Sequence, residues 1–292
     1  MAISTGTLAT KSLHPDFGAE ISGVDLRRPL DHDAWAQIWE AFNDHSLLVF
    51  HDQPLTDDEQ MRVSLRFGPL ETTIKTLGKE DRLHPNLVEL ANVDEDGRLM
   101  DWSDKRMLYQ SGNQLWHSDS SFKRVPAQAS LLSGRRVPPE GGETEFVSCR
   151  VAWEALSSEM QRRLESKVAI HSFAYSRGLI DPTLLGQDVK DALPPVRQAL
   201  VRANPVNGRK SVYIGSHASH IEGLPVEEGR ALLQELLARA TQSERVYRHV
   251  WRQDDLVVWD NRCMLHRGRP WDAKRYTRVM HRTTVAGDGP TA

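Results

Sequence analysis

The chain has 292 residues, of which 39% are hydrophobic, and its 37 Lys and Arg against 40 Asp and Glu give a formal net charge of −3. A chain of this length can bury a sizeable core, either as one large β domain or as two small domains. The charge balance offers no basic excess for nucleic acid or for an anionic membrane surface. No run approaches the roughly 18 apolar residues of a membrane span. We therefore expect neither nucleic-acid nor membrane partners.

Two further features concern the cellular compartment. The first residues, MAISTGTLATKSLHP, lack a charged segment followed by an apolar run, so they do not resemble a signal peptide. The only cysteines are Cys149 and Cys263. Two cysteines in a chain this long do not form a disulfide scaffold, and they suit a reducing compartment. These features predict a cytoplasmic protein.

The N-terminal part begins with helix and strand signals. Residues 31–45 place apolar side chains on one helical stripe, and LLVF at 47–50 is typical of a short buried strand. Thr56 and Glu59 form a capping-box pattern, which predicts the start of a helix that ends near Gly68.

The next segment, residues 71–112, is polar, charged and loop-like. A connection that long inside a compact domain is usually functional or disordered.

The rest of the chain is dominated by short strand-like runs. One further helix is expected over 226–240, where leucines form a stripe. Many short strands with a few helices mostly near the ends suggest a β-barrel or jelly roll with helices packed outside. The strand-like runs are 128–134, 143–149, 167–175, 211–216, 245–251, 255–260 and 276–285.

A possible metal site is encoded by WHSDSS at 116–121. On a strand, residues two apart face the same way, so His117 and Asp119 can point at one ion. His266, just beyond the apolar strand at 255–260, is a candidate third ligand. Two histidines and a carboxylate occupy one face of an octahedral ion and leave other positions open, as in non-haem Fe(II) oxygenases. Taken alone, however, H-x-D arises by chance, and a histidine after a strand can be an ordinary surface or core residue.

A possible anion site lies further along the sequence. Arg278 and Arg282 alternate onto one face of the strand at 276–285, and a guanidinium binds a carboxylate in bidentate fashion. The alternative is a solvated strand face, with Arg282 only paired to an acid such as Asp119. Thr144, which follows the paired-glycine turn of PPEGGETEF, can offer a hydroxyl to an anion or serve as a plain strand residue.

Together these motifs resemble the taurine / 2,4-dichlorophenoxyacetate dioxygenases, which depend on Fe(II) and 2-oxoglutarate. The resemblance spans about residues 13 to 286 and is strongest to the aryloxyalkanoate branch. It implies a mainly β fold with flanking helices around a double-stranded β-helix (jelly roll, cupin-like) core. It also implies a single domain over 1–292, an active-site lid over 71–112, and a homo-oligomer. The motifs that carry it are WHSDSSF, PPEGGETEF, IGSHASHIEGLPVEEGR, LVVWDNRCMLHRG and the strand with Arg278 and Arg282.

The resemblance also assigns roles to residues. It implies Fe(II) as the metal, with 2-oxoglutarate and O₂ as cosubstrates. Arg282 would lie near the carboxylate of a small anionic substrate, and Lys75 matches a lysine of the family's lid. Further pocket candidates are Ser121, His217 and His220. The implied iron ligands are His117, Asp119 and His266, and the implied 2-oxoglutarate residues are Arg278 and Thr144.

The implied reaction is hydroxylation of an aryloxyalkanoate such as 2,4-dichlorophenoxyacetate, giving a phenol, an oxoacid, succinate and CO₂. One position departs from this branch, because Asn204 stands where phenoxyacetate-degrading members carry a histidine. An alkyl sulfonate such as taurine, or another small acid, is therefore kept as an alternative substrate.

Two other classes of protein remain open from the residues alone. A zinc-type hydrolase could use the same three ligands with a metal-bound water. It would not need a second anion clamp such as Arg278. A non-catalytic β-barrel binding module is the other possibility, and it gives no reason for three metal-type ligands and two arginines on one strand face.

Overall fold

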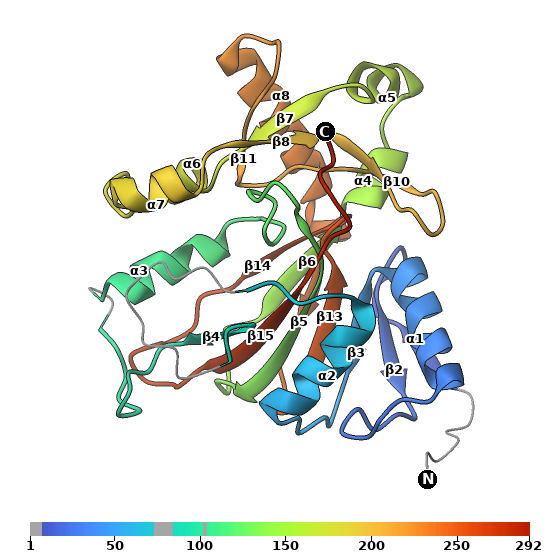
Figure 1. Cartoon of the computed structure of the whole chain (residues 1–292), viewed down its shortest axis with the longest axis vertical. Coiled ribbons are helices and arrows are strands. Elements are labelled where there is room, and N and C mark those ends of the chain that lie inside the picture. Colours follow the sequence, from blue (N-terminus) through green and yellow to red (C-terminus); the bar gives the residue numbers. More distant parts are fainter. Residues whose placement is uncertain (1–7, 73–83, 102–103) are drawn as a thin grey trace.

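The computed structural model describes residues 8–72, 84–101 and 104–292 (Figure 1). Its largest element is a seven-stranded sheet whose central strands are buried on both faces. The described neighbours pair antiparallel except β2 and β3, which are parallel. In spatial order the strands are β1 (Ala9–Ser12), β2 (Ala19–Ser22), β3 (Leu47–Phe50), β13 (Leu256–Asp260), β5 (Ala127–Arg136), β15 (Val279–Ala286) and β4 (Leu87–Ala91).

Three smaller sheets complete the β structure. The sheet that matters for the site contains β6 (Thr144–Ser148) between β12 (Tyr247–His249) and β14 (Met264–Gly268). A second sheet has β7 (Val168–His171) between β11 (Ala218–Ile221) and β8 (Val196–Ala199), and β9 (Val201–Ala203) pairs with β10 (Lys210–Val212).

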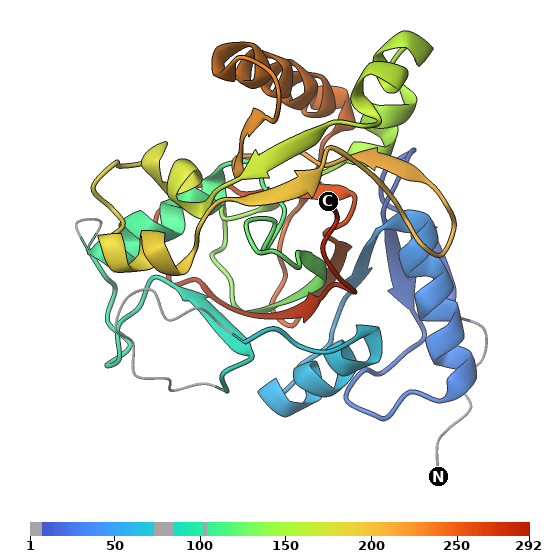
Figure 2. The same cartoon turned by 45° about the horizontal axis from the view of Figure 1, so that its top comes forward.

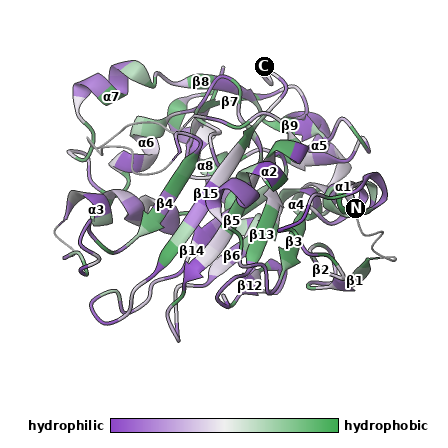
Figure 3. Ribbon diagram, turned by 60° about the horizontal axis from the view of Figure 1, so that its bottom comes forward, coloured by the Kyte–Doolittle hydropathy of each residue, from purple (hydrophilic) through white to green (hydrophobic). Residues whose placement is uncertain are grey.

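Helices cover the sheets on opposite sides of the molecule. On one side, α1 (His32–His45) and α2 (Asp57–Phe67) bury aromatic and aliphatic side chains against the large sheet. On the other, α8 (Val226–Ala240) lies along the sheet of β7, β8 and β11 (Figure 2). Figure 3 shows β3 and β13 as mostly hydrophobic, as expected for strands in the core. The shorter helices are α3 (Lys105–Ser111), η1 (Gly112–Gln114), α4 (Cys149–Glu154), α5 (Ser158–Leu164), α6 (Phe173–Gly178), α7 (Gln187–Ala192) and η2 (Ser243–Arg245).

The local signals at the N-terminal end are confirmed. The expected helix at 31–45 is α1, and the strand at 47–50 is β3. The capping box is formed: Glu59 N donates to Thr56 Oγ1 over 3.3 Å, and Thr56 N donates to Glu59 Oε2 over 2.8 Å.

The chain has a mixed helix-and-sheet fold with one large sheet. It contains more helix than was expected for a mainly β fold. The run at 167–175 shows why. It was expected to be one strand, but β7 ends at His171 and α6 begins at Phe173. Ser172 separates them because its Oγ accepts a hydrogen bond from Tyr175 N over 3.1 Å, capping the helix. Such short helices leave no clear periodicity in the sequence.

The loop-like expectation for 71–112 is wrong for its described part. Residues 87–91 form β4 at the edge of the large sheet, where β4 pairs with β15, and 105–111 form α3. Leu87, Ala91 and Met107 are buried. The run LVELA is short and lies between polar stretches, so its strand character depends on a partner almost 200 residues away in the sequence. Within the described residues, no helix is both long and apolar enough to cross a membrane.

Candidate active site

His117, Asp119 and His266 come together from two distant parts of the chain. Their ligand atoms all lie within 4.8 Å of one another, and all three side chains are buried. The backbones of His117 and His266 form an isolated antiparallel bridge, with N–H to O distances of 3.0 and 2.9 Å. Asp119 reaches the same point from a turn and not from a regular strand. The convergence of the three side chains was therefore predicted correctly, but the backbone conformation of Asp119 was not.

The side chains around the triad fix its orientation. The Nδ1 atom of His117 lies 2.7 Å from the carbonyl oxygen of Leu115, which favours a proton on Nδ1 and leaves Nε2 as the ligand atom. Ser130 Oγ donates to Asp119 Oδ2 over 2.7 Å, and Asn261 Nδ2 donates to Ser130 Oγ over 2.8 Å. This supporting network was not anticipated, because no motif links Ser130 and Asn261 in the sequence.

The electrostatics suit a divalent cation. Burial opposes ionisation of Asp119, but the positive charge of Arg282, with smaller contributions from the neighbouring histidine rings and from the hydrogen bond of Ser130, outweighs it and holds the pKa of the carboxyl well below its usual range. Burial lowers the pKa of both His117 and His266. The carboxylate is therefore ionised and the imidazoles are neutral near pH 7, which are the forms that bind metal. Two histidine nitrogens and one carboxylate fit a facial Fe(II) site with open positions.

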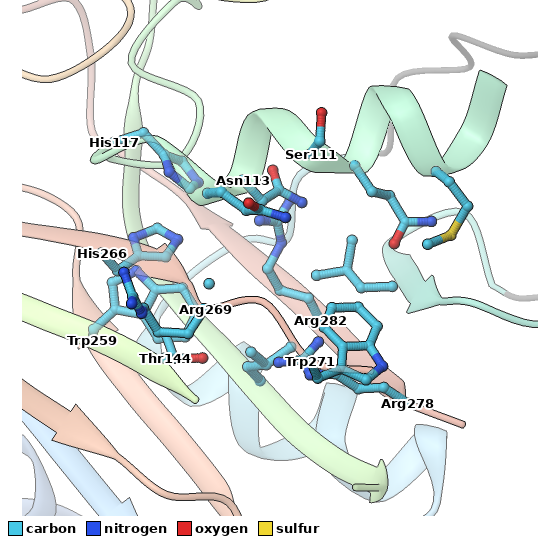
Figure 4. A pocket seen from close by; sticks show the side chains of 16 residues that line it. Ser111, Asn113, His117, Thr144, Trp259, His266, Arg269, Trp271, Arg278 and Arg282 are labelled. Carbon is cyan, nitrogen blue, oxygen red and sulfur yellow. The ribbon is translucent and has the colours of Figure 1, made fainter. Parts of the chain in front are cut away.

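A pocket adjoins the triad (Figure 4). His117 and His266 lie at one end, and Arg278 and Trp271 lie toward the other. The pocket therefore joins two of the candidate metal ligands, His117 and His266, to both arginines for which an anion-binding role was predicted. Its lining residues are Leu90, Met107, Gln110, Ser111, Asn113, Gln114, His117, Leu132, Thr144, Trp259, His266, Gly268, Arg269, Trp271, Arg278 and Arg282.

Sequence reasoning missed several walls of this pocket. Leu90 lies on β4, and Met107 and Gln110 lie on α3, within the segment expected to be a loop. Trp259 lies beside His266, with ring centroids 4.6 Å apart. The sequence offered one signal for Trp259 as a pocket residue, because Trp259 lies in the apolar strand just before His266.

Arg278 is a buried cation without a carboxylate partner among the described residues. Its Nε donates to the carbonyl oxygen of Gly142 over 3.2 Å, and its guanidinium lies 5.3 Å from the ring of Trp271. Burial lowers the pKa of Arg278 to about 10, so the group is still charged at pH 7. Thr144 lines the same pocket. A buried, unpaired cation is costly, so this end of the pocket favours an anionic ligand.

Gly142 is required at this position. Its φ is +70°, and a Cβ there would lie 3.2 Å from Cδ of Arg278. The paired-glycine turn therefore leaves room for the side chain of Arg278 in the pocket.

Arg282 is paired with Asp119, as in the alternative role considered for it from the sequence. Its Nη1 donates to Asp119 Oδ1 over 2.5 Å. It also lines the pocket, between the candidate metal ligands and Arg278. Arg282 is thus paired with one of the candidate metal ligands in this structure.

The remaining candidates are placed as follows. His217 is buried, and its ring centroid lies 6.2 Å from that of His117. Ser121 is buried nearby in the chain, where its carbonyl oxygen accepts from Gln198 Nε2 over 2.9 Å. His220 lies on β11 with its Nδ1 3.0 Å from Ser219 Oγ. None of these three candidates lines the pocket described above.

Two other positions bear on the substrate. Lys75 lies outside the described residues. Asn204 is buried in the turn between β9 and β10, and its Nδ2 donates to Asn43 Oδ1 over 3.2 Å. Asn204 does not line the pocket described above.

Comparison with known proteins places this geometry in a family. The model of "Taurine catabolism dioxygenase TauD, TfdA family" matches residues 9–284. The chain belongs to this family.

Individual relatives of this TauD/TfdA member support the assignment. It is 43% identical over 281 residues to the alpha-ketoglutarate-dependent 2,4-dichlorophenoxyacetate dioxygenase of Cupriavidus pinatubonensis, covering 96% of this chain and 98% of the relative. It is 38% identical to an (S)-phenoxypropionate/alpha-ketoglutarate-dioxygenase of Sphingobium herbicidovorans, covering 94% of each. The crystal structure of AAD-2 in complex with Mn(II) and N-oxalylglycine matches with a TM-score of 0.90 and 42% identity, covering 98% of this chain and 99% of that one.

Proposed function

We propose that this TauD/TfdA dioxygenase hydroxylates an aryloxyalkanoate acid, with 2,4-dichlorophenoxyacetate as a representative substrate. The enzyme class is that of the family: an oxidoreductase that uses Fe(II), 2-oxoglutarate and O₂. The observation that carries the site assignment is a buried arginine without an acidic partner, Arg278, in the same pocket as a two-histidine, one-carboxylate triad.

In this proposal His117, Asp119 and His266 hold the iron. When bound, the iron couples oxidative decarboxylation of 2-oxoglutarate by O₂ to hydroxylation of the substrate. Ser130 keeps Asp119 oriented, and Leu115 keeps the Nε2 atom of His117 unprotonated.

Arg278 and Thr144 are proposed to bind the carboxylate of 2-oxoglutarate that is remote from the metal. A guanidinium matches a carboxylate with two parallel N–H donors, and a threonine hydroxyl can add a third. N-oxalylglycine, bound in the AAD-2 crystal structure, has the same two carboxylate ends as 2-oxoglutarate.

Hydroxylation of the carbon between the ether oxygen and the carboxylate explains the proposed products. One oxygen atom of O₂ enters succinate, and the other enters the substrate as a hydroxyl group. The resulting hemiacetal breaks its bond to the aryloxy oxygen, which gives a phenol and an oxoacid. Relatives named for 2,4-dichlorophenoxyacetate and for (S)-phenoxypropionate support this class. An alkyl sulfonate such as taurine, named in the family's description, is the second candidate.

Further parts of the proposal concern the rest of the substrate site and the chain as a whole. Arg282, His217, Ser121, His220 and Lys75 remain candidates around the substrate. We propose that the sheets form the double-stranded β-helix (jelly roll) of a single domain over 1–292. The antiparallel pairing of β5 with β13 and β15, and of β6 with β12 and β14, supports this arrangement.

We also propose that 71–112 acts as a lid, that the enzyme forms a homo-oligomer, and that it is cytoplasmic. The lid is supported by Leu90 and Met107, which line the pocket from within this segment. The two buried free cysteines agree with a reducing compartment. Hydrogen exchange should show protection of 71–112 when substrate binds, and equal protection with and without substrate would contradict a lid.

Two experiments test the proposed function. Fe(II) and 2-oxoglutarate added without oxygen should give a weak visible charge-transfer band, which a zinc hydrolase would not give. Succinate release should then be measured across aryloxyacetates, aryloxypropionates, alkyl sulfonates and alkyl sulfates. Preference for the aryloxy acids supports the proposal, and turnover of sulfonates alone would transfer the function to the second candidate.

A further inference from the structure

Asn261, which follows β13, is a fully buried residue beside the candidate metal ligands. Its amide oxygen, Oδ1, accepts a hydrogen bond from Asp119 N over 3.1 Å. Its amide nitrogen, Nδ2, donates to Ser130 Oγ over 2.8 Å, and Ser130 Oγ donates to Asp119 Oδ2 over 2.7 Å. The same amide group therefore acts on Asp119 twice, directly at its backbone and, through Ser130, at its carboxylate.

The hydrogen bond from Asn261 sets the direction in which the Ser130 hydroxyl donates. A serine hydroxyl has one proton and two acceptor lone pairs, and it can rotate. Because Asn261 Nδ2 occupies an acceptor position of Ser130, the serine proton points to Asp119 Oδ2. Ser130 is itself fully buried on β5, so bulk solvent does not compete for this proton. The Asp119 carboxylate is therefore held in one orientation.

The amide oxygen of Asn261 also anchors the aromatic ring beside a second candidate ligand. Trp259 Nε1 donates to Asn261 Oδ1 over 3.0 Å. The ring of Trp259 lies 4.6 Å from that of His266, measured between centroids. Asn261 thus fixes the position of a ring that packs on His266 as well as that of Asp119.

The backbone of Asn261 is held by hydrogen bonds of its own. Its N donates to Gln128 O over 2.8 Å, and its O accepts from Ser118 Oγ over 2.6 Å. Ser118 lies between His117 and Asp119 in the chain. The segment that carries two candidate ligands is therefore bonded to a rigid part of the core.

The chemistry of the amide suits this position. An asparagine side chain ends in one oxygen, which can accept two N–H donors, and one nitrogen, which can donate to a hydroxyl. An ionised aspartate of similar size has no donor for Ser130, and a leucine has neither group. Without the amide, Asp119 N, Trp259 Nε1 and Ser130 Oγ would each lose a partner in a buried site, which is costly.

We propose that Asn261 is a positioning residue of the metal site, which holds Asp119 in the orientation in which it binds the ion. This inference rests on the proposed function, in which His117, Asp119 and His266 are the iron ligands. Asn261 does not line the pocket, so it acts on the ion through Asp119 and through the ring beside His266. Its loss should therefore weaken metal binding, whereas the binding of 2-oxoglutarate at saturating metal depends mainly on Arg278.

Calorimetric titration with Mn(II), the ion in the AAD-2 crystal structure, measures metal binding without turnover. Asn261→Ala should raise the Kd for Mn(II) by about 10-fold to 100-fold, as is typical when a residue that orients a metal ligand is lost. Ser130→Ala removes one of the two links to Asp119 and should raise the Kd by about threefold to 10-fold. Because both residues act on the same carboxylate, the double variant should bind Mn(II) within about twofold of Asn261→Ala.

Asn204→Ala is the matched control, because it removes another buried asparagine, whose side chain bonds to Asn43 and to Val206 N. It should lower the Tm and leave the Kd for Mn(II) unchanged. A merely structural role for Asn261 would give this same result in Asn261→Ala. At saturating Fe(II), the KM for 2-oxoglutarate should stay within about twofold in Asn261→Ala, since Arg278 is intact.

The possible outcomes separate this inference from the proposed function. A wild-type Kd for Mn(II) in folded Asn261→Ala, or fully additive effects of the Asn261 and Ser130 substitutions, would overturn the inference alone. If circular dichroism shows that Asn261→Ala does not fold, Ser130→Ala decides: weaker Mn(II) binding supports the inference, and an unchanged Kd overturns it. Failure of the wild-type protein to bind Mn(II), or equally tight binding by Asp119→Ala, would overturn the proposed metal site and this inference with it.

Discussion

Trp251 Nε1 donates a hydrogen bond to Thr144 Oγ1 over 3.0 Å. Because the threonine oxygen accepts this bond, its own proton is free to point to a ligand in the pocket. Trp251 is held in turn by the ring of His249, 4.6 Å away and nearly perpendicular, and His249 Nε2 lies 3.1 Å from Asp255 Oδ2. A buried chain of side chains therefore sets the direction of the Thr144 hydroxyl.

We predict that Trp251→Phe raises the KM for 2-oxoglutarate about threefold to tenfold. The substitution keeps an aromatic ring but removes a neutral hydrogen bond worth about 1 kcal/mol. The KM for the aryloxy acid should not change. Trp35→Phe, on α1, is a control that removes an indole remote from the pocket lining. Equal KM values for 2-oxoglutarate in all three enzymes would show that Trp251 does not position Thr144.

Removal of a metal ligand tests the triad. Asp119→Ala or His266→Ala should abolish iron binding and turnover, because two ligands do not hold Fe(II) in this site. Calorimetric titration with Fe(II) under anaerobic conditions measures the first effect, and circular dichroism checks that the fold persists. Asp181→Ala removes an exposed carboxylate whose nearest partner is Thr183, and it serves as the control. Wild-type activity of either ligand variant at low iron would make the assignment wrong.

Arg278→Leu should weaken 2-oxoglutarate binding by about 10-fold to 100-fold, since a charge-assisted pair contributes roughly 1.5–3 kcal/mol. The substitution also removes an unpaired buried cation, so the free protein should not be destabilised. Initial rates at varied 2-oxoglutarate concentration give the answer. An unchanged KM would mean that another cation, such as Arg269 in the pocket wall, binds the cosubstrate.

Arg282→Met distinguishes two roles. If Arg282 mainly supports Asp119, its loss should raise the pKa of that carboxyl, since the arginine is the largest favourable influence on its ionisation. On acidification, the Asp119 carboxyl would then become protonated at a higher pH than in the wild type. The lowest pH at which the protein still binds iron should therefore rise. If Arg282 also binds substrate, the KM for the acid should rise and succinate should form without matching phenol. A pH titration of iron binding, with both products measured, separates these outcomes.

The sequence predicted the convergence of the three candidate ligands better than the walls of the pocket. His117, Asp119 and His266 could be selected because their side-chain types suit a divalent ion, although Asp119 lies on a turn and not on the strand that the periodicity predicted. The support from Ser130 and Asn261 could not, because it depends on strands that pair only in the folded chain. The strand β4 and the short helix α3 were missed for a related reason. Their apolar residues are few, and their stability comes from β15 and from burial rather than from local propensity.

Arg177, a buried residue of α6, shows another limit of sequence reasoning. Nothing in AYSRG distinguishes it from a solvated arginine at the end of a helix, as the basic last turn of a short helix is common. Only the fold places Gly112, Tyr109 and Phe173 around its guanidinium.

The central claim is that oxidation of the aryloxy acid is coupled to decarboxylation of 2-oxoglutarate. The most direct test is the stoichiometry of one reaction: purified enzyme, Fe(II), 2-oxoglutarate and 2,4-dichlorophenoxyacetate in air, with succinate and 2,4-dichlorophenol measured together. The account predicts equal amounts of the two products, and no phenol when either oxygen or 2-oxoglutarate is left out. Phenol release without oxygen, or succinate that does not depend on the aryloxy acid and forms without phenol, would contradict it.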